Sequence, residues 1–259
     1  MTSLQTRGKL YLVPNTLDFG VSADAAHADL QTVLPLQVIQ IAARLTQWVA
    51  ENAKTTRAFL KRVDSVVPLS QALQSLNIVE LPRPQKGAKV AVRAPLDGLL
   101  APALQGLDIG LISEAGLPAV ADPGAALVEA AHRLGVLVMP LSGPSSLLMA
   151  LSASGLNGQS FAFVGYLPVD AAQRTIKLRE LEAMSRRHQQ TQLMIETPYR
   201  NQALMAAMLS SLGANCQLSV SCGLTLEGGW TRTDSVALWK QRPTHLPNDI
   251  PAVFALLSV

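Results

Sequence analysis

Short apolar runs alternate with helical segments in the middle of the chain, and this alternation restricts the possible fold more than any other feature. Residues 109–112 and 136–141 are apolar runs of strand length. Between them a helix is predicted over residues 122–134, with Asp122 as its N-cap, and a second helix follows over 145–154. Strands joined through helices are typical of parallel sheets that are covered on both faces. The alternation therefore predicts an α/β fold.

The second half of the chain has a different pattern, which predicts a mixed sheet. The pair Gly228–Gly229 and the alternating segment 230–236 after it predict a hairpin. The elements expected here are strands over 161–166, 193–195, 218–222 and 252–257, and helices over 174–186 and 201–212. We therefore expect an N-terminal α/β domain over residues 1–142, with a parallel sheet, and a C-terminal α/β domain over residues 143–259, with a mixed sheet.

The N-terminal third gives fewer signals. An apolar run over residues 10–13 predicts a buried strand. Apolar residues recur near helical spacing over 33–48, which predicts one amphipathic helix that includes Trp48. Another helix begins at Lys54, whereas prolines and glycines interrupt residues 68–94, where no element is predicted.

The composition allows a large core and a surface with few charges. Apolar residues make up 49% of the 259 residues, and charged residues make up 15%. No apolar run approaches the roughly 18 residues that span a bilayer. We therefore expect no membrane contact and a cytoplasmic location.

The two cysteines, Cys216 and Cys222, are predicted to lie on one face of a single strand. Six residues of extended chain separate their positions by about 20 Å, which is too far for a disulfide, so both are expected to be reduced thiols. The four histidines are scattered without the spacing of metal ligands. No metal site is expected.

Several common catalytic signatures are absent from the sequence. It contains no G-x-G-x-x-G motif that opens a helix after a strand, and no G-x-x-x-x-G-K-[ST] motif. It also lacks a G-x-S-x-G elbow, because Gly143 is followed by PSSL. These absences argue against a hydrolase and against a nucleotide triphosphatase.

Two loops of small residues each follow a predicted strand and precede a predicted helix. They are SEAGLP over residues 113–118 and SGPSS over residues 142–146. Small residues at the carboxyl end of a strand let a ligand approach the backbone, and open α/β sheets bind ligands at such ends. Each loop alone is also consistent with an ordinary strand-to-helix turn. On neighbouring strands, they would form two walls of one pocket.

From Ser113 onward the sequence resembles the tetrapyrrole methylase superfamily. Within it, the match is to the branch of the ribosomal RNA small-subunit 2′-O-ribose methyltransferases. That branch typically reads S-D-A-G-x-P, D-P-G, P-G-P-S, A-L-S-A-S-G and F-x-G-[FY]-L-P, and this chain reads SEAGLP, DPG, SGPS, ALSASG and FVGYLP. The segment ETPYR, which begins at Glu196, is similar to the branch's E-S-P-H-R.

The N-terminal third departs from the pattern of that branch. The loop usually read as T-P-I-G-N is PNTLD here, over residues 14–18, and the segment E-D-T-R is ENAK, over residues 51–54. In the family these loops lie on the acceptor side of the cleft. The chain is thus similar to a divergent subgroup, and the departure concerns the acceptor more than the cofactor.

The resemblance implies a two-domain tetrapyrrole methylase-like fold with S-adenosyl-L-methionine in a cleft between the domains. A ribose hydroxyl acceptor would be helped by a base, and Glu196 and Glu51 are the candidate catalytic carboxylates. For each, the alternative is a structural hydrogen-bond partner. The positions that match the family's cofactor loops are Glu114, Ala115, Gly116, Leu117, Ser145, Ser146, Gly223, Leu224, Thr225, Pro251 and Ala252.

The function is left open among three classes of protein. The nearest branch acts on ribosomal RNA in the small ribosomal subunit, and basic residues crowd two predicted helices, which is consistent with phosphate contacts or with solvated helix faces. The alternatives are a methyltransferase for a tetrapyrrole or other small molecule, and a non-catalytic S-adenosylmethionine-binding protein. The family resemblance also implies a homodimer. The basic residues are Lys54, Arg57, Lys61 and Arg62 on one helix, and Arg174, Lys177, Arg179, Arg186 and Arg187 on the other.

Overall fold

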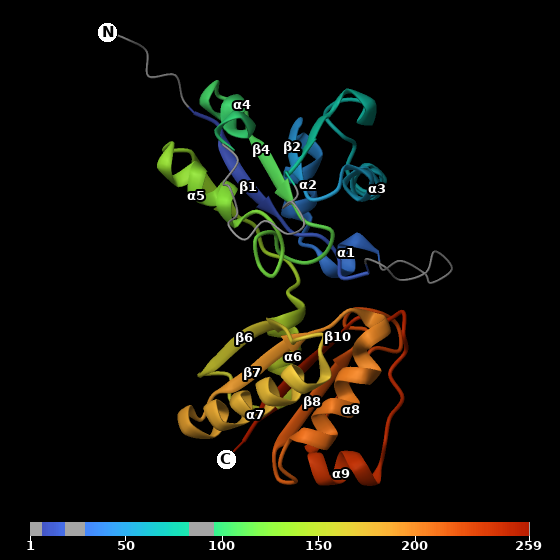
Figure 1. Cartoon of the computed structure of the whole chain (residues 1–259). Helices are drawn as coiled ribbons and strands as arrows, with labels where there is room; N and C mark the ends of the chain where they lie inside the picture. The colour runs from blue at the N-terminus through green and yellow to red at the C-terminus, as the bar shows by residue number, and fades with distance from the viewer. Residues whose placement is uncertain (1–6, 19–28, 83–95, 259) are drawn as a thin grey trace. The chain divides into compact units, whose positions relative to one another are not determined.

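The computed structural model of the chain describes residues 7–18, 29–82 and 96–258. The described residues up to Pro144 form one unit, and those from Ser145 onward form a second (Figure 1). Each unit has its own sheet and its own core, and each is described by itself below.

The strands described in the first unit form a parallel sheet. They are β1 (Lys9–Val13), β2 (Gln47–Ala50), β3 (Asn77–Glu80), β4 (Ile109–Ile112) and β5 (Leu137–Pro140). Their order is β3-β2-β4-β1-β5, and every neighbouring pair is parallel. The central strand β4 is buried at every position, as expected for a parallel strand that is covered on both faces. The predicted parallel sheet is confirmed.

Helices cover both faces of this sheet (Figure 1). They are α1 (Leu30–Val33), α2 (Leu36–Arg44), α3 (Ala53–Asp64), the 3₁₀ turns η1 (Leu73–Ser75) and η2 (Asp97–Leu100), α4 (Ala101–Leu104) and α5 (Ala125–Arg133). One core joins α2 and α3 to the sheet through Ile39 and Phe59. A second core joins α4 and α5 to it through Ala103 and Leu127. The two faces of the sheet are thus buried by different helices.

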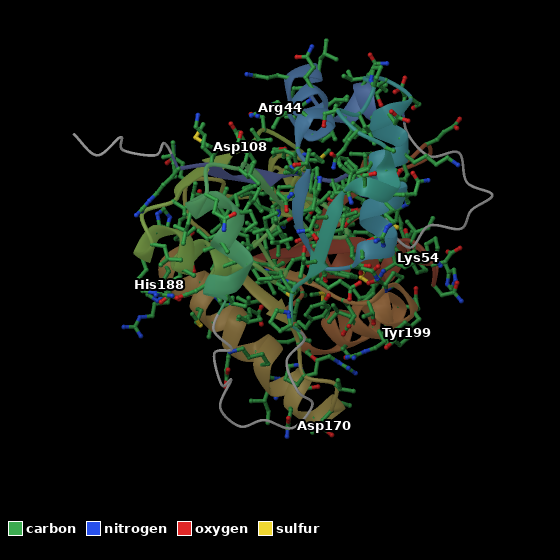
Figure 2. All side chains as sticks on the ribbon, turned by 90° about the horizontal axis from the view of Figure 1, so that it is seen from above. Arg44, Lys54, Asp108, Asp170, His188 and Tyr199 are labelled. Carbon is green, nitrogen blue, oxygen red and sulfur yellow. The ribbon has the colours of Figure 1, made fainter. Side chains whose placement is uncertain are left out.

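An ion pair ties α2 to the start of β4. The Arg44 guanidinium lies 2.7 Å from the Asp108 carboxylate, and Figure 2 labels both residues. Arg44 donates a second hydrogen bond, of 2.8 Å, to the Tyr11 hydroxyl. Arg44 also lies over the Tyr11 ring, 5.0 Å from its centre. These contacts join the end of α2 to β1 and β4 at the amino-terminal part of the sheet.

The single helix predicted over residues 33–48 is wrong. The segment forms α1 and α2, which Pro35 separates, and Trp48 lies in strand β2. The Trp48 ring packs over Gly110 of the neighbouring strand, where a Cβ would lie only 2.6 Å from the indole. This close cross-strand packing depends on a residue far away in the sequence, so helical spacing alone could not reveal it.

The predicted start of the helix over residues 122–134 is also wrong. Asp122 is not an N-cap, because α5 begins at Ala125 and its N-cap is Gly124, with φ +136°. That backbone conformation favours glycine, and a Cβ here would lie 3.1 Å from the Leu111 side chain. The helix therefore starts later than the D-P pair suggests, and Asp122 lies in the loop before it.

The strands described in the second unit form a mixed sheet, as predicted. They are β6 (Phe161–Tyr166), β7 (Thr191–Ile195), β8 (Gln217–Cys222), β9 (Trp230–Ser235) and β10 (Ala252–Leu257). Their order is β6-β7-β10-β8-β9. Strands β6 and β7 are parallel, and the other neighbours are antiparallel. The hairpin predicted around Gly228–Gly229 is β8 and β9.

The helices of the second unit pack into two separate cores. They are α6 (Ser146–Ser154), α7 (Ala171–His188), the 3₁₀ turn η3 (Pro198–Arg200), α8 (Asn201–Ser211) and α9 (Val236–Gln241). Residues of α7, α8 and α9 share one core with Phe254 of β10. Leu147 and Leu151 of α6 share the other with Val253, the neighbour of Phe254. Because adjacent strand residues point to opposite faces, α6 covers one face and the longer helices cover the other.

Both cysteines are buried and free, as the sequence analysis expects. In the described ranges no helix is long and apolar enough to cross a membrane. Among these same residues, no cluster of histidine, cysteine or acidic side chains is arranged to hold a metal ion.

Candidate functional site

The carboxyl ends of three neighbouring strands in the first unit are level with one another. Val13 of β1 and Ala50 of β2 both pair with Ile112 of β4. The residues that follow these strands are therefore brought to one edge of the sheet, although they come from three distant parts of the sequence. Ligands of open α/β sheets bind at such an edge.

Glu51 and Glu114 meet at this edge. The Glu114 backbone N–H donates a 3.0 Å hydrogen bond to Oε2 of Glu51. The Glu51 backbone N–H in turn donates to the Ile112 carbonyl, at 3.1 Å, so it continues the ladder between β2 and β4. The Thr55 hydroxyl on α3 lies 3.5 Å from Oε1 of Glu114. Glu51, a candidate base, and Glu114, a candidate cofactor residue, are thus held in the same small region.

Asp122 adds a third acidic side chain to this region, and the sequence analysis missed it as a site residue. Burial, and then the charges of Glu51 and Glu114, raise the pKa of Asp122 to about 7. Such a shift marks a group whose charged form is disfavoured by its surroundings until a cation or a hydrogen-bond donor reaches it. The signal in the sequence was the D-P-G motif, which capping explained equally well.

The predicted loop 113–118 presents backbone at this edge. Gly116 is buried with φ +64°, a conformation that favours glycine. A Cβ there would lie 3.4 Å from the Leu17 side chain and 3.6 Å from the Pro144 carbonyl. Ala115 and Leu117 on either side are half-buried. The Ser113 hydroxyl is buried and has no hydrogen-bond partner within the described part of the chain.

The second predicted loop, 142–146, crosses the boundary between the units. Gly143 lies against Pro14, and a Cβ at Gly143 would come within 2.2 Å of the proline ring. Ser145 is the N-cap of α6, and Ser146 is its first residue.

The predicted residues of the second unit also gather at one edge of its sheet. Strand β10 begins where its antiparallel neighbours end, with Ala252 opposite Cys222 and Val253 opposite Ile195. The segments that meet there are Glu196 after β7, Gly223–Thr225 after β8, and Pro251–Ala252 at the start of β10. The Gly223 N–H donates to the Pro251 carbonyl at 3.0 Å. Thr225, with φ +68°, is one of the non-glycine residues in the left-handed region.

Glu196 is engaged within its own loop. Its Oε2 lies 2.8 Å from the Arg200 guanidinium, and its side chain is 1% exposed. Its Oε1 accepts a 2.8 Å hydrogen bond from the Thr197 N–H. These contacts favour the structural alternative for Glu196 over the role of a base.

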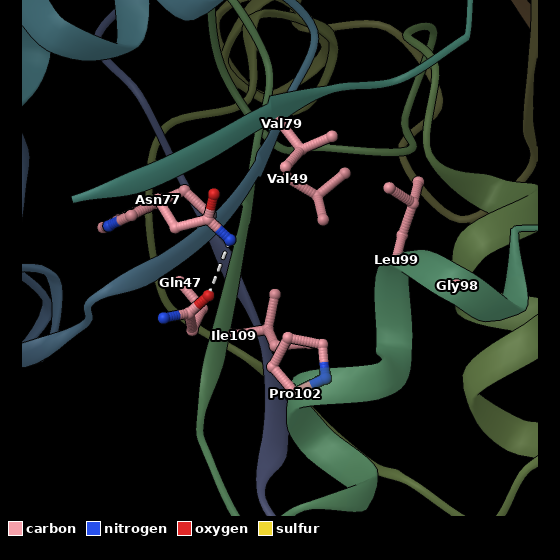
Figure 3. A pocket seen from close by; sticks show the side chains of 9 residues that line it. Gln47, Val49, Asn77, Val79, Gly98, Leu99, Pro102 and Ile109 are labelled. Carbon is pink, nitrogen blue, oxygen red and sulfur yellow. Dashed lines mark hydrogen bonds between the residues drawn. The ribbon is translucent and has the colours of Figure 1, made fainter.

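A small cavity lies toward the other end of the first unit's sheet. It is lined by Gln47, Asn77 and Ile109, the first residues of their strands, and is closed by Leu99 and Pro102 (Figure 3). Its volume is about 60 Å³, whereas pockets for drug-sized ligands measure roughly 300 to 1,000 Å³. This cavity is therefore too small for a nucleoside cofactor.

The basic residues of the two predicted helices differ in their contacts. Arg62 pairs with Asp18 at 3.2 Å, Lys177 with Glu180 at 3.2 Å, and Arg186 with Glu182 at 3.7 Å. Arg174 donates to the Val169 carbonyl at 3.2 Å. Lys54, Arg57 and Lys61 are exposed on α3 and, at positions i, i+3 and i+7, lie along one side of the helix.

Comparison with known proteins gives relatives for part of this chain. No protein-family model matches it. It is 41% identical to ribosomal RNA small subunit methyltransferase I of Vibrio cholerae serotype O1 over 122 residues, which is 47% of this chain and 41% of that protein. It is 39% identical to the protein of the same name in Mesorhizobium japonicum over 127 residues, 49% of this chain and 42% of that protein. The chain therefore matches less than half the length of these relatives.

Among solved structures, the native form of uroporphyrin III C-methyltransferase from Thermus thermophilus aligns with 97% of this chain and 98% of its own. The TM-score is 0.53 and the sequence identity is 15%. An identity this low supports a shared fold and nothing finer.

The fold and the strand-end loops thus place the chain in the class of two-unit α/β proteins with the tetrapyrrole methylase fold. Within this class, the resemblance to the ribosomal RNA small-subunit methyltransferase branch is confirmed over the matched half of the chain.

Proposed function

We propose that this protein is an S-adenosyl-L-methionine-dependent methyltransferase that acts on a ribose 2′-hydroxyl of ribosomal RNA. The observation that carries the proposal is the group of acidic side chains around loop 113–118, formed by Glu51, Glu114 and Asp122. The names of the relatives supply the acceptor class.

The residues at this edge fit the proposed cofactor. S-adenosylmethionine carries a positive sulfonium and a positive ammonium group, which the carboxylates of Glu51, Glu114 and Asp122 complement. Gly116 has no side chain that would stand between its backbone and a ligand. The Ser113 hydroxyl, which has no hydrogen-bond partner among the residues that the structure describes, is an additional hydrogen-bonding group in the same loop. The predicted cofactor residues of the second unit remain part of this proposal.

The bound cofactor supplies an electrophilic methyl group, so the task of the chain is to position the acceptor and remove its proton. We propose that Glu51 accepts the proton of the acceptor hydroxyl. Its Oε2 accepts from the Glu114 N–H, and its Oε1 has no hydrogen-bond donor among the described residues. In this assignment Glu196 positions η3 through Arg200.

The acceptor side is supported by the exposed row of Lys54, Arg57 and Lys61 on α3. This helix begins at Ala53, and its N-cap Asn52 directly follows Glu51. The row therefore leads away from the proposed site and can neutralise phosphates of a bound RNA. A ribosomal substrate would also place the protein in the cytoplasm.

We further propose a homodimer. Strand β6 lies at the edge of its sheet. On β6 and the segment after it, Phe161, Tyr166, Val169 and Ile176 are 41%, 60%, 73% and 59% exposed. Exposed apolar side chains that form a contiguous patch mark protein interaction sites, and we propose that these four contribute to the dimer interface. Light scattering at micromolar concentration should report twice the monomer mass of 27.5 kDa.

The acceptor is tested by labelling. Purified protein is incubated with methyl-labelled cofactor and, separately, with small ribosomal subunits, free ribosomal RNA and a small-molecule extract. Label in ribose of the RNA supports the proposal. Label only in the extract identifies a small-molecule methyltransferase. Cofactor binding by calorimetry with no label in any fraction identifies a non-catalytic binding protein.

A further inference from the structure

Asn15 contacts the backbone of loop 113–118 at several points. Its N–H donates to the Gly116 carbonyl at 2.9 Å. Its side-chain Nδ2 donates to the carbonyls of Ser113, at 3.2 Å, and Glu114, at 3.0 Å. One buried residue thus binds three carbonyl groups of the loop and turns them toward β1.

The orientation of the Asn15 side chain is itself fixed. Its Oδ1 accepts a 2.9 Å hydrogen bond from the Thr16 N–H. The amide can therefore direct only its NH₂ group toward the loop. The Thr16 hydroxyl in turn donates to the Asp18 carboxylate.

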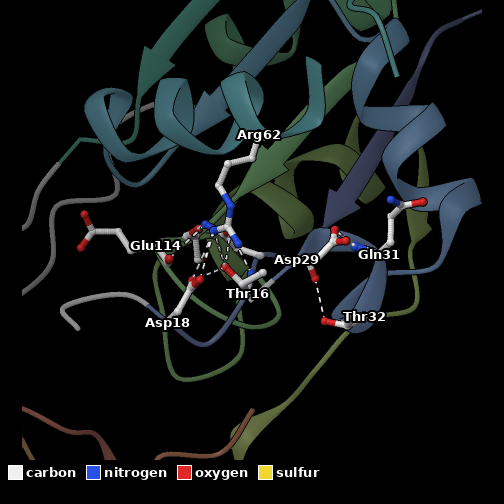
Figure 4. A network of polar contacts seen from close by, with 9 residues as sticks. Thr16, Asp18, Asp29, Gln31, Thr32, Arg62 and Glu114 are labelled. Atoms are coloured by element: carbon white, nitrogen blue, oxygen red, sulfur yellow. Dashed lines mark hydrogen bonds and ion pairs between the residues drawn. The ribbon is translucent and has the colours of Figure 1, made fainter. Parts of the chain in front are cut away.

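Arg62 of α3 anchors this chain of contacts (Figure 4). Its Nη1 donates to the Thr16 hydroxyl at 3.1 Å and lies 3.2 Å from Oδ2 of Asp18. The Asp18 side chain is only 7% exposed. Removal of Arg62 would take this cation away from a buried carboxylate, which is more costly than the loss of a surface ion pair.

The contacts run without a break from α3 to the candidate cofactor loop, through residues in which this chain departs from the family's T-P-I-G-N loop. We propose that Arg62 and Asn15 are positioning residues, which hold loop 113–116 in the conformation that receives the cofactor. This inference rests on the proposed function. It also removes Arg62 from the set of phosphate-binding candidates, because its guanidinium is committed to Thr16 and Asp18.

A structural role alone would make these residues matter for folding but not for the ligand. The two roles differ in the ligand-free protein. A positioning network holds the loop ordered before any cofactor binds, so the Glu114 amide, which donates to Glu51, stays protected from hydrogen exchange in the ligand-free protein. It also lowers the cost of ordering the loop when the ligand arrives.

The test compares Asn15→Ala and Arg62→Ala with matched controls in the same unit. Asn77→Ala removes an asparagine that bonds to Gln47 at 2.8 Å. Arg133→Ala removes an exposed ion pair with Asp97. Calorimetry with S-adenosylhomocysteine gives the affinity, thermal melting gives the stability, and hydrogen exchange reports on residues 113–117.

We expect Asn15→Ala and Arg62→Ala to weaken binding by about tenfold or more, because the loop must then be ordered on binding, and to speed exchange in residues 113–117. Arg62→Lys should recover most of the affinity, since it restores a cation beside Asp18. The controls should bind as the wild type does. If the variants melt earlier but bind within about twofold of the wild type, the network is only structural and the inference is wrong.

Two further outcomes are decided by the same measurements. If Arg62→Ala does not fold, Asp18→Asn removes the charge of the pair while it keeps the shape, and the same loss of affinity is expected. If the wild type does not bind S-adenosylhomocysteine, the proposed function fails. Hydrogen exchange then still shows whether Asn15 orders the loop, and unchanged exchange in Asn15→Ala would overturn the inference by itself.

Discussion

The backbone N–H of Glu114 donates a hydrogen bond to the side chain of Glu51, with 3.0 Å between the nitrogen and Oε2. This bond joins the carboxyl ends of β2 and β4. The Glu51 side chain therefore contacts the backbone of loop 113–118, and Glu114 belongs to the loop itself. The same contact thus holds the loop in position and brings the two acidic residues together.

Replacing Glu51 should separate these two effects. Glu51→Gln keeps an oxygen that accepts from Glu114 but removes the charge, so it should weaken S-adenosylmethionine binding by about threefold to tenfold. It should affect S-adenosylhomocysteine less, because that ligand lacks the sulfonium. Glu80→Gln is the matched control, since Glu80 also accepts from a backbone N–H, that of Ala53, at 2.8 Å. Equal losses for the two ligands in Glu51→Gln would contradict an electrostatic role.

Asp122 should make stability depend on pH. Its folded-state pKa of about 7 lies above the value of about 3.9 in an unfolded chain. The folded protein therefore binds the proton more tightly, and stability is lost as pH rises from about 4 through 7. Asp122→Asn cannot ionise, so it should gain stability relative to the wild type between about pH 5 and pH 8. Urea unfolding of the wild type and of Asp122→Asn at about pH 5 and about pH 8 checks this prediction. If the difference in unfolding free energy between the two proteins is the same at both pH values, the prediction is wrong.

Gly116 should tolerate neither a side chain nor a change of conformation. At φ +64° an L-residue costs about 1–2 kcal/mol. Gly116→Ala and Gly116→Val should both lose stability to this extent, but the branched side chain of valine should also abolish cofactor binding. Gly155→Ala introduces the same strain at φ +69°, where nothing lies within 4 Å, and should leave binding unchanged. Normal binding by Gly116→Val would show that this loop does not face the ligand.

The basic row on α3 should govern RNA binding. The double reversal Arg57→Glu with Lys61→Glu should weaken RNA association and reduce its log–log salt slope by about two, since fewer counterions are released. Reversal of the exposed Arg179 and Arg187 on α7 serves as the control. Binding measured at several salt concentrations decides the matter. If both double variants behave as the wild type does, the row is only a solvated helix face.

The two cysteines should be inert in the folded protein. Burial raises the pKa of Cys216 to about 12, and burial likewise raises the pKa of Cys222. Because the thiolate is the reactive form, a thiol reagent at neutral pH should label neither cysteine until urea unfolds the chain. A cysteine placed at the exposed Ser65 should react at once. Rapid labelling of the wild type would contradict the burial of both thiols.

The sequence by itself determined the class of the fold and the motifs of the site. Apolar runs such as residues 109–112 are long enough only for strands. A parallel strand that is buried on both faces must be apolar at nearly every position. The loops of small residues after these strands could also be identified from the sequence. The positive φ at Gly116 is a local requirement that favours glycine. Glu51 and Glu114 were identified through the resemblance to known motifs.

The tertiary structure alone decided which polar groups meet. Trp48 is a strand residue because it packs on Gly110, and Asp122 has a raised pKa because Glu51 and Glu114 lie nearby. Asn15 and Arg62 contact the same network although 46 positions separate Arg62 from Thr16. Local periodicity encodes which face of an element is buried, but the strand order β2-β4-β1 sets which loops become neighbours. That order results from packing across the whole sheet, so no local stretch of sequence contains it.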